Sequence, residues 1–118
     1  MASTPLESVV TSITIEAKED VAAHVGIELE TGKTPDAEGD PILGITLHPA
    51  KNGEKVAVAA AGIAQLTMAE AVAAQKAVMI ATSGKGKART GALHVAGVTL
   101  AASAADGDIV PVLIRAET

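Results

Sequence analysis

Apolar and polar residues alternate along several short stretches of this chain, most clearly in residues 44–58. Early in this stretch Ile45 and Leu47 alternate with polar neighbours, and near its end Val56 and Val58 alternate again. A period of two is typical of a strand with one buried face. The Pro-Ala-Lys-Asn-Gly sequence between the two parts supplies residues that end a strand and tolerate a positive φ. The pattern therefore predicts a strand, a turn and a second strand.

The same pattern returns about fifty residues later, in residues 97–112. The glycine before the first strand and the glycine of the turn both recur, so Gly44 and Gly53 correspond to Gly97 and Gly107. We expect these four glycines to hold equivalent structural positions at turns and strands. The predicted tandem copies span about residues 13–58 and 64–112. Since two copies are fewer than a solenoid needs, the copies are expected to share one core.

Further short strands are predicted from the other periodic stretches. The full set of expected strands is Val9–Ile15, Val25–Leu29, Ile42–His48, Lys55–Ala60, Gly62–Thr67, Val78–Ala81, Leu93–Leu100 and Asp108–Arg115. Many short strands with Gly-bearing turns indicate a mainly β fold, a small β-barrel or sandwich. One or two short helical turns are also expected, in the Ala-rich segments Met68–Lys76 and Ala101–Ala105. Residues 83–88 are expected to form a flexible loop.

The composition predicts one domain with a thin core. At 118 residues the chain has the length of a single domain, which we place at residues 13–118. It contains no Phe, Tyr or Trp, and 25 of its residues are Ala. An aromatic side chain buries about 150–250 Å² whereas Ala offers one methyl group, so Val, Ile, Leu and Met carry the core almost alone. Self-association is one way to add the missing burial.

Residues 1–12 lie outside the repeat and are predicted to form an N-terminal arm. Pro5 favours an extended backbone and lacks an N–H group, so a central strand is not expected there. Leu6, Val9 and Val10 nevertheless supply apolar anchors. We predict that the arm contacts a neighbouring molecule through these four residues. The alternative is a frayed terminus in which Val9 and Val10 complete the first strand.

Charge and cysteine content exclude several classes of function. The net charge is -5, and residues 16–40 hold eight acids against two lysines. With this charge and no aromatic residue to stack on a base, nucleic-acid binding is not expected. The chain has no Cys, which excludes disulfides, thiolate metal sites and thiol nucleophiles. No stretch approaches the ~20 apolar residues of a membrane span, and residues 1–5 lack the character of a secretory signal, so no membrane partner is expected.

No motif in the sequence predicts catalysis or a cofactor. Residues 83–87 resemble a phosphate-binding loop, but the required upstream glycine is replaced by Met79, and no hydroxyl residue follows either lysine. The three histidines lack the spacing of metal ligands within one chain, although three copies of one histidine could meet on a trimer axis. These histidines are His24, His48 and His94.

The paired acids are expected to be solvent-exposed. Glu28 and Glu30 share one face of a predicted strand. Calcium is the alternative for Asp36, Glu38 and Asp40, but these residues lack the closing Glu of a calcium loop. No Ser has a recognisable His and Asp partner, so the chain is not expected to be an enzyme.

The repeated phrases resemble those of bacteriophage capsid cement, or head-decoration, proteins. The resemblance is carried by Ile-Leu-Gly-Ile-Thr-Leu at 42–47, Asn-Gly-Glu-Lys-Val-Ala-Val at 52–58, Ala-Ala-Gly-Ile-Ala at 60–64, and residues 95–114. In one respect the chain departs from the family, which often has Gly-Asp after an Ala-Ala pair. This chain has His24-Val25 and Gln75-Lys76 at those positions.

The resemblance implies a non-enzymatic structural protein of the virion. It implies a homotrimer on the outer capsid surface, made in the host cytoplasm, with the major capsid protein as partner and no cofactor or metal. The contact of Pro5, Leu6, Val9 and Val10 with the capsid or a neighbouring subunit, predicted above from the arm itself, is compatible with this role. The alternative is a ligand- or carbohydrate-binding β module on a virion or cell surface, which the absence of aromatic residues disfavours.

Overall fold

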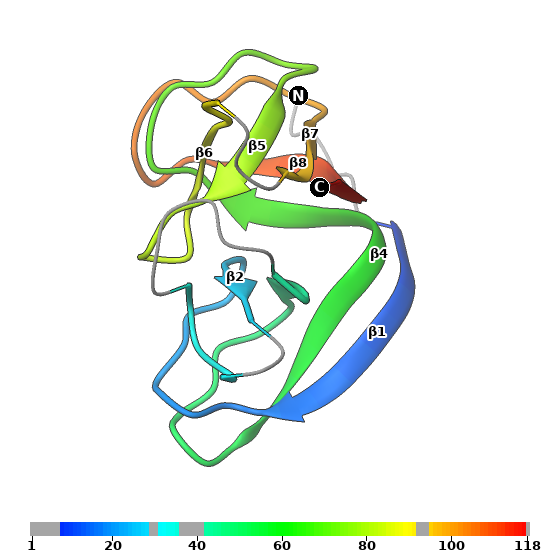
Figure 1. Cartoon of the computed structure of the whole chain (residues 1–118), viewed down its shortest axis with the longest axis vertical. Helices are drawn as coiled ribbons and strands as arrows, with labels where there is room; N and C mark the ends of the chain where they lie inside the picture. Colours follow the sequence, from blue (N-terminus) through cyan, green and yellow to red (C-terminus); the bar gives the residue numbers. More distant parts are fainter. Residues whose placement is uncertain (1–7, 29–30, 36–41, 92–94, 118) are drawn as a thin grey trace, which may run out of the picture.

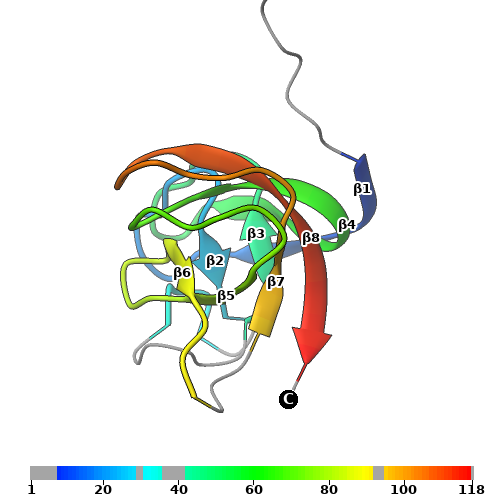
Figure 2. The same cartoon turned by 90° about the horizontal axis from the view of Figure 1, so that it is seen from above.

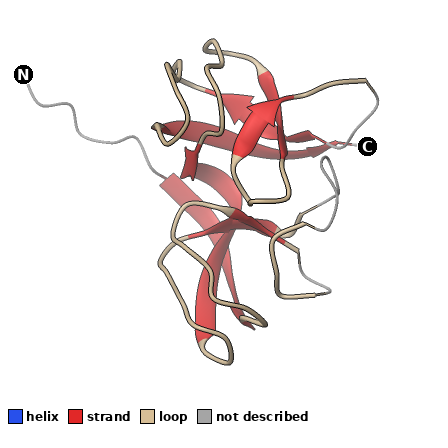
Figure 3. Ribbon diagram, turned by 90° about the vertical axis from the view of Figure 1, so that its left-hand side faces the viewer, coloured by secondary structure: helices blue, strands red, loops and turns tan. Residues whose placement is uncertain are grey.

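In the part of the chain that the computed structural model describes, every regular element is a β-strand (Figures 1 and 3). The structure describes residues 8–28, 31–35, 42–91 and 95–117, without the side chains of Ser8, Val10 and residues 115–117. Its strands are β1 Ser8–Glu16, β2 Gly26–Ile27, β3 Gly44–Thr46, β4 Lys55–Thr67, β5 Ala77–Ile80, β6 Gly86–Ala88, β7 Val95–Thr99 and β8 Ile109–Glu117. The mainly β fold predicted from the sequence is confirmed.

The strands form one antiparallel sheet that curls into a nearly closed barrel (Figure 2). Its order is β2-β3-β4-β8-β7-β5-β6, with β1 paired to β4 beside this path. The two ends of the path approach each other, because the Gly26 N–H donates to the Gly84 carbonyl at 2.8 Å. Gly84 also tolerates the close approach, since a Cβ there would lie 2.9 Å from Cβ of Val25. Closing the sheet in this way leaves few unpaired strand edges.

Strand β4 belongs to both halves of the molecule. Its first half pairs with β1 and β3, and its second half pairs with β8. In these ladders Ile13 lies opposite Val58, and Ala64 lies opposite Val112. Between the two halves Gly62 adopts a φ of 101°, which L-residues with side chains rarely adopt. Figure 1 shows β4 running along β1 and then bending towards β8.

A buried threonine makes the same hydrogen bonds in each half. Oγ1 of Thr46 donates to the Ala22 carbonyl at 2.7 Å and accepts from the Val25 N–H at 3.1 Å. In the second half, Oγ1 of Thr99 makes the two equivalent bonds at 2.7 and 3.0 Å. Each threonine is fully buried and ties the preceding loop to the first strand of its hairpin. The hydroxyl therefore satisfies two backbone groups that would otherwise be buried without a partner.

The loops that these threonines hold contain the two departures from the family pattern. His24 and Gln75 both have a φ of 62°, the conformation that glycine adopts most readily. The His24 N–H donates to the Thr46 carbonyl at 2.9 Å, and the Gln75 N–H donates to the Thr99 carbonyl at 2.7 Å. The left-handed turn is thus retained in both halves, although neither residue is a glycine.

At one equivalent position of β4 and β8, the two halves differ in how the outward-facing backbone group is satisfied. The Ala57 N–H points out of the β1–β4 ladder and donates to Nε2 of His48 at 3.1 Å, while Nδ1 of that ring lies 3.0 Å from the Pro49 carbonyl. In the second half the equivalent residues are Pro111 and Ala101, as the matching bonds to the carbonyls of Ala57 and Pro111 show. Proline has no N–H to satisfy, so no imidazole is needed there.

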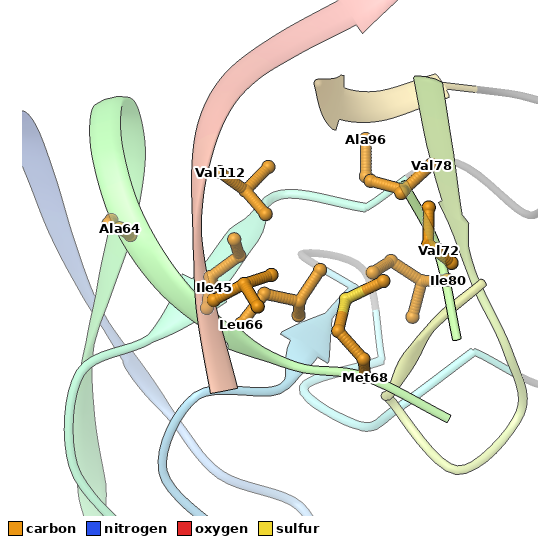
Figure 4. Packing of buried hydrophobic residues seen from close by; sticks show 11 residues of the cluster. Ile45, Ala64, Leu66, Met68, Val72, Val78, Ile80, Ala96 and Val112 are labelled. Carbon is orange, nitrogen blue, oxygen red and sulfur yellow. The ribbon is translucent and has the colours of Figure 1, made fainter. Parts of the chain in front are cut away.

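Two clusters of buried aliphatic side chains form the core. The larger cluster comprises Ile45, Ala59, Ala64, Leu66, Met68, Val72, Val78, Ile80, Ala96, Val110 and Val112 (Figure 4). The smaller cluster comprises Ala17, Val21, Ile27, Ala50, Val56 and Val58. The larger cluster therefore belongs mainly to the second half but includes two residues of the first, Ile45 and Ala59.

The predicted helical turns are not formed in Met68–Lys76 or Ala101–Ala105. Instead, the two segments lie against each other through an antiparallel bridge between Val72 and Ser103. The Met68 N–H donates to the Asp108 carbonyl at 2.7 Å. This hydrogen bond joins residues far apart in the sequence, unlike the bonds within a helix. Tertiary pairing has overridden the helix propensity of alanine.

The prediction of a flexible loop at residues 83–88 is also corrected by the structure. Its last three residues form β6, which pairs with β5, and Gly84 and Gly86 are buried. A Cβ on Gly86 would lie 2.8 Å from Sδ of Met68, so the glycine permits close packing.

The threonine hydrogen bonds predict a matched stability test. We expect Thr46→Val and Thr99→Val each to lower the free energy of unfolding by about 2–3 kcal/mol. Each substitution leaves a buried N–H and a buried carbonyl without a hydrogen-bond partner. Thr→Ser at the same positions retains the hydroxyl and should cost less. Urea unfolding followed by far-ultraviolet circular dichroism measures both, since the chain has no aromatic fluorophore. A smaller loss for Thr→Val than for Thr→Ser would show that the methyl group, not the hydroxyl, matters.

The His48 contact predicts that one half can be converted to the chemistry of the other. We expect His48→Ala to lower the free energy of unfolding by about 1 kcal/mol, because the Ala57 N–H loses its acceptor. Adding Ala57→Pro removes that N–H and should recover part of the loss. Thermal unfolding of the single and double variants provides the measurement. A double variant that is less stable than His48→Ala alone would contradict this explanation.

Candidate functional site

The two histidines in the described part of the chain have structural surroundings. Both ring nitrogens of His48 lie within hydrogen-bond distance of backbone groups. Nδ1 of His24 is buried without a partner. His94 lies outside the described residues. Within the ranges that the structure describes, no group of three or more His, Cys, Asp or Glu side chains is arranged to hold a metal ion.

The basic segment after Ile80 does not form a phosphate cradle. Nζ of Lys85 lies 2.9 Å from Oδ1 of Asp106, so its charge is paired across to the loop before β8. Both glycines of the segment are buried against the rest of the protein rather than open towards a ligand. Close packing explains the Gly-Lys-Gly sequence.

The acids of the first half engage neighbouring groups on the surface. Oε1 of Glu28 accepts a hydrogen bond from the Thr31 hydroxyl at 3.0 Å. Nζ of Lys18 lies 2.7 Å from Oε2 of Glu16, and this hydrogen bond and the lysine charge lower the pKa of that carboxyl. The pair is exposed, so it contributes little to stability. Glu30, Asp36, Glu38 and Asp40 lie outside the described residues, and their predicted roles stay untested.

The four glycines singled out by the repeat fall into two matched pairs. Gly44 and Gly97 lie where two strands approach closely, because an added Cβ would clash with the carbonyl oxygen of Ala59 or of Leu113. Gly53 and Gly107 lie in open turns with φ of 92° and 96°, and nothing lies within 4 Å of an added Cβ. The first pair is needed for space and the second for backbone conformation.

Of the predicted arm contacts, only Val9 is described with its side chain. Its backbone pairs with Gly62 of β4, and its half-buried side chain packs against the larger core cluster. Val10 lies in β1, while Pro5 and Leu6 lie outside the described residues. The predicted contact of these four residues with a neighbour stays a prediction.

An exposed apolar surface covers the outside of the β7–β8 hairpin, and the sequence interpretation missed it. Leu100, Ile109 and Leu113 are 37%, 50% and 36% exposed. Val98 and Pro111 between them are partly exposed. The run from 109 to 114 is apolar on both of its faces, which was the available signal. Such a run predicts a strand covered on both sides, whereas one side of this strand is open.

An open depression lies near the turn of the first hairpin. It has a volume of about 360 Å³ and is lined by Asp20, Val21, Pro49, Ala50, Lys51 and Glu54. None of these side chains is aromatic, so the depression lacks the stacking platform typical of a sugar site. Over residues 8–28, 31–35, 42–91 and 95–117, no helix has the length and apolar character needed to cross a membrane.

The chain matches a known protein family and a solved structure. The model of a family described as "Phage cement protein" matches residues 7–114. Among solved structures, the head fiber gp8.5 N base of bacteriophage phi29 is similar, with a TM-score of 0.73 and 16% sequence identity over 89% of this chain and 93% of that chain. At this identity the likeness shows a shared fold. No curated protein matches the chain.

The matched glycines predict unequal costs of adding one methyl group. We expect Gly44→Ala and Gly97→Ala to lower the free energy of unfolding by about 3 kcal/mol, the upper range for overpacking, because the added Cβ meets a strand carbonyl. Gly53→Ala and Gly107→Ala should cost about 1 kcal/mol, since only the positive φ is disfavoured. Urea unfolding of the four variants tests this order. Similar losses in all four would show that close approach is not the limiting factor.

Proposed function

Because the chain belongs to the phage cement protein family, a structural and non-enzymatic family of the phage head, we propose that it binds the outer surface of a capsid and holds neighbouring capsid subunits together. The observation that carries the proposal is the family match over residues 7–114, nearly the whole chain. The partner is the major capsid protein. No catalytic step is required, because such a protein acts through the interface that it buries against the capsid.

Mass action explains how such binding stabilises a capsid. A protein that binds only the assembled shell stabilises it by RT ln(1 + [L]/Kd), and many copies per particle multiply this effect. An oligomer that contacts several capsid subunits at once gains further from its high effective concentration.

The proposal includes self-association into a homotrimer. The family resemblance supports the number three, and the composition supports association of some kind. A chain without aromatic residues and with many alanines has little apolar area to bury by itself. Exposed aliphatic side chains on the β7–β8 hairpin provide area that an oligomer could bury. The carbohydrate-binding alternative gains no support from the depression near Asp20.

Addition to undecorated, expanded capsids tests the capsid role directly. We expect the purified protein to bind them to a fixed stoichiometry and to raise the temperature at which they release DNA or disassemble. Cosedimentation gives the occupancy, and differential scanning calorimetry of the particles gives the stabilisation. Binding without a ceiling, or no binding at any concentration, would argue against the role.

Residues 1–10 of the arm are proposed to hold the neighbour, and a deletion tests this separately. Removing residues 2–7 spares β1, which begins at Ser8. We expect weaker capsid binding, because Pro5 and Leu6 are lost, with an unchanged unfolding transition of the isolated protein. A matched control replaces residues 2–7 by Gly and Ser, which keeps the length and removes the apolar anchors. Unchanged capsid occupancy for both variants would rule out a contact through Pro5 and Leu6.

A further inference from the structure

Within the chain, the first half packs against the second through one row of residues. Gly26, Ile45 and Ala59 are register partners on β2, β3 and β4, so they lie side by side on one face of the sheet. Ile45 and Ala59 are fully buried and belong to the core cluster of the second half. Figure 4 shows Ile45 beside Leu66. A Cβ on Gly26 would lie 2.8 Å from the side chain of Ile80.

The second half carries an equivalent row whose residues belong to neither core cluster. Ala77, Val98, Leu113 and Ile63 are register partners on β5, β7, β8 and β4. In the repeat, Ala77, Val98 and Leu113 correspond to Gly26, Ile45 and Ala59 of the first row. Ile63 corresponds to the β1 residue that pairs with Ala59. All four are apolar, yet none is buried, and Leu113 is 36% exposed. We call this set the outer row.

The surface that receives the first row also has an exposed counterpart. Ala64 and Leu66 of β4 lie in the larger core cluster with Ile45 and are fully buried. Their equivalents in the first half are Ile13 and Ile15 of β1, because Ile13 pairs with Val58 as Ala64 pairs with Val112. Ile13 is 38% exposed, and Ile15 is partly exposed although it packs against the smaller core cluster. We call these two residues the β1 acceptor.

This pattern shows that the two halves pack head to tail. A closed two-fold arrangement would bury equivalent residues equally, and here one copy of each surface is buried while the other is only partly covered. Repeats that stack in one direction leave such a pair of complementary surfaces at their two ends. Among the side chains that the structure describes, three of the four large exposed hydrophobic ones lie on or beside these end surfaces: Ile13, Leu100 and Leu113.

We propose that the outer row of one chain docks on the β1 acceptor of a second copy of this chain, repeating between molecules the contact that joins the two halves within one. Such a contact is heterologous, so it closes into a ring or continues as a filament. The inference deepens the self-association in the proposed function and rests on it only for the number of subunits.

The charges of the two halves favour the same pairing. Residues 13–58 carry nine acids against four lysines, whereas residues 64–112 carry three acids against four bases. A contact between the second half of one chain and the first half of the next therefore brings a slightly basic surface to an acidic one. Contacts between two first halves would place like charges together.

Cysteine cross-linking distinguishes this contact from other arrangements. The described chain has no free cysteine, and the sequence contains none, so introduced thiols react alone. Val98→Cys and Ile15→Cys correspond to the contact between Ile45 and Leu66. We expect a short bis-maleimide to cross-link the two variants when they are mixed, in solution or on decorated capsids, but not either variant by itself. Asn52→Cys, on an exposed turn, is the control and should cross-link with neither.

The outcomes separate the inference from the capsid role. Cross-linking of Val98→Cys with itself would indicate a two-fold contact and overturn the inference. A mixed sample that stays uncross-linked both in solution and on capsids would also overturn it, even if capsid binding is normal. Leu113→Lys supplies an independent readout, since we expect it to lower the oligomer mass while the unfolding transition is retained. If Leu113→Lys abolished capsid binding without changing the oligomer mass, the outer row would be a capsid contact instead.

Discussion

The sharing of β4 between two repeats is the constraint on which the rest of the structure depends. One strand of thirteen residues serves as the last strand of the first repeat and the first strand of the second. The repeats therefore cannot turn freely against each other, and their relative orientation is set by the bend at Gly62. That orientation places Ile45 against the second core, which compensates for the small side chains available. A protein with no aromatic residues thereby buries its aliphatic side chains from two repeats in one continuous sheet.

The repeats have retained their backbone framework while their surfaces have diverged. The buried Thr46 and Thr99 make identical bonds, and the loops before them keep the same left-handed residue without glycine. Differences appear where the framework permits more than one solution, as with His48 in one repeat and Pro111 in the other.

Sequence periodicity was sufficient to predict the hairpins around residues 44–58 and 97–112, because period-two alternation and turn glycines report local structure. It failed at Met68–Lys76, where alanine propensity favours helix but the backbone bonds are made with residues about thirty positions away. Strand β6 was missed because three residues with two small side chains show no alternation. The apolar run at 109–114 revealed a strand but not which of its faces is covered, since covering depends on the packing direction of the repeats. The arm contacts depend on a partner that one sequence does not contain.

The shared strand also has a consequence for the order in which the protein is made. A chain emerging from the ribosome completes the first repeat once residues 55–58 are available to pair with β1 and β3, whereas β8 comes about fifty residues later. Until then the second half of β4 is an unpaired edge, and Ile45 and Ala59 are uncovered. Unpaired edges and bare apolar surface are the features that lead nascent chains to associate wrongly. Until β8 is made, the row formed by Ile45 and Ala59 is thus as bare as the outer row is in the finished protein.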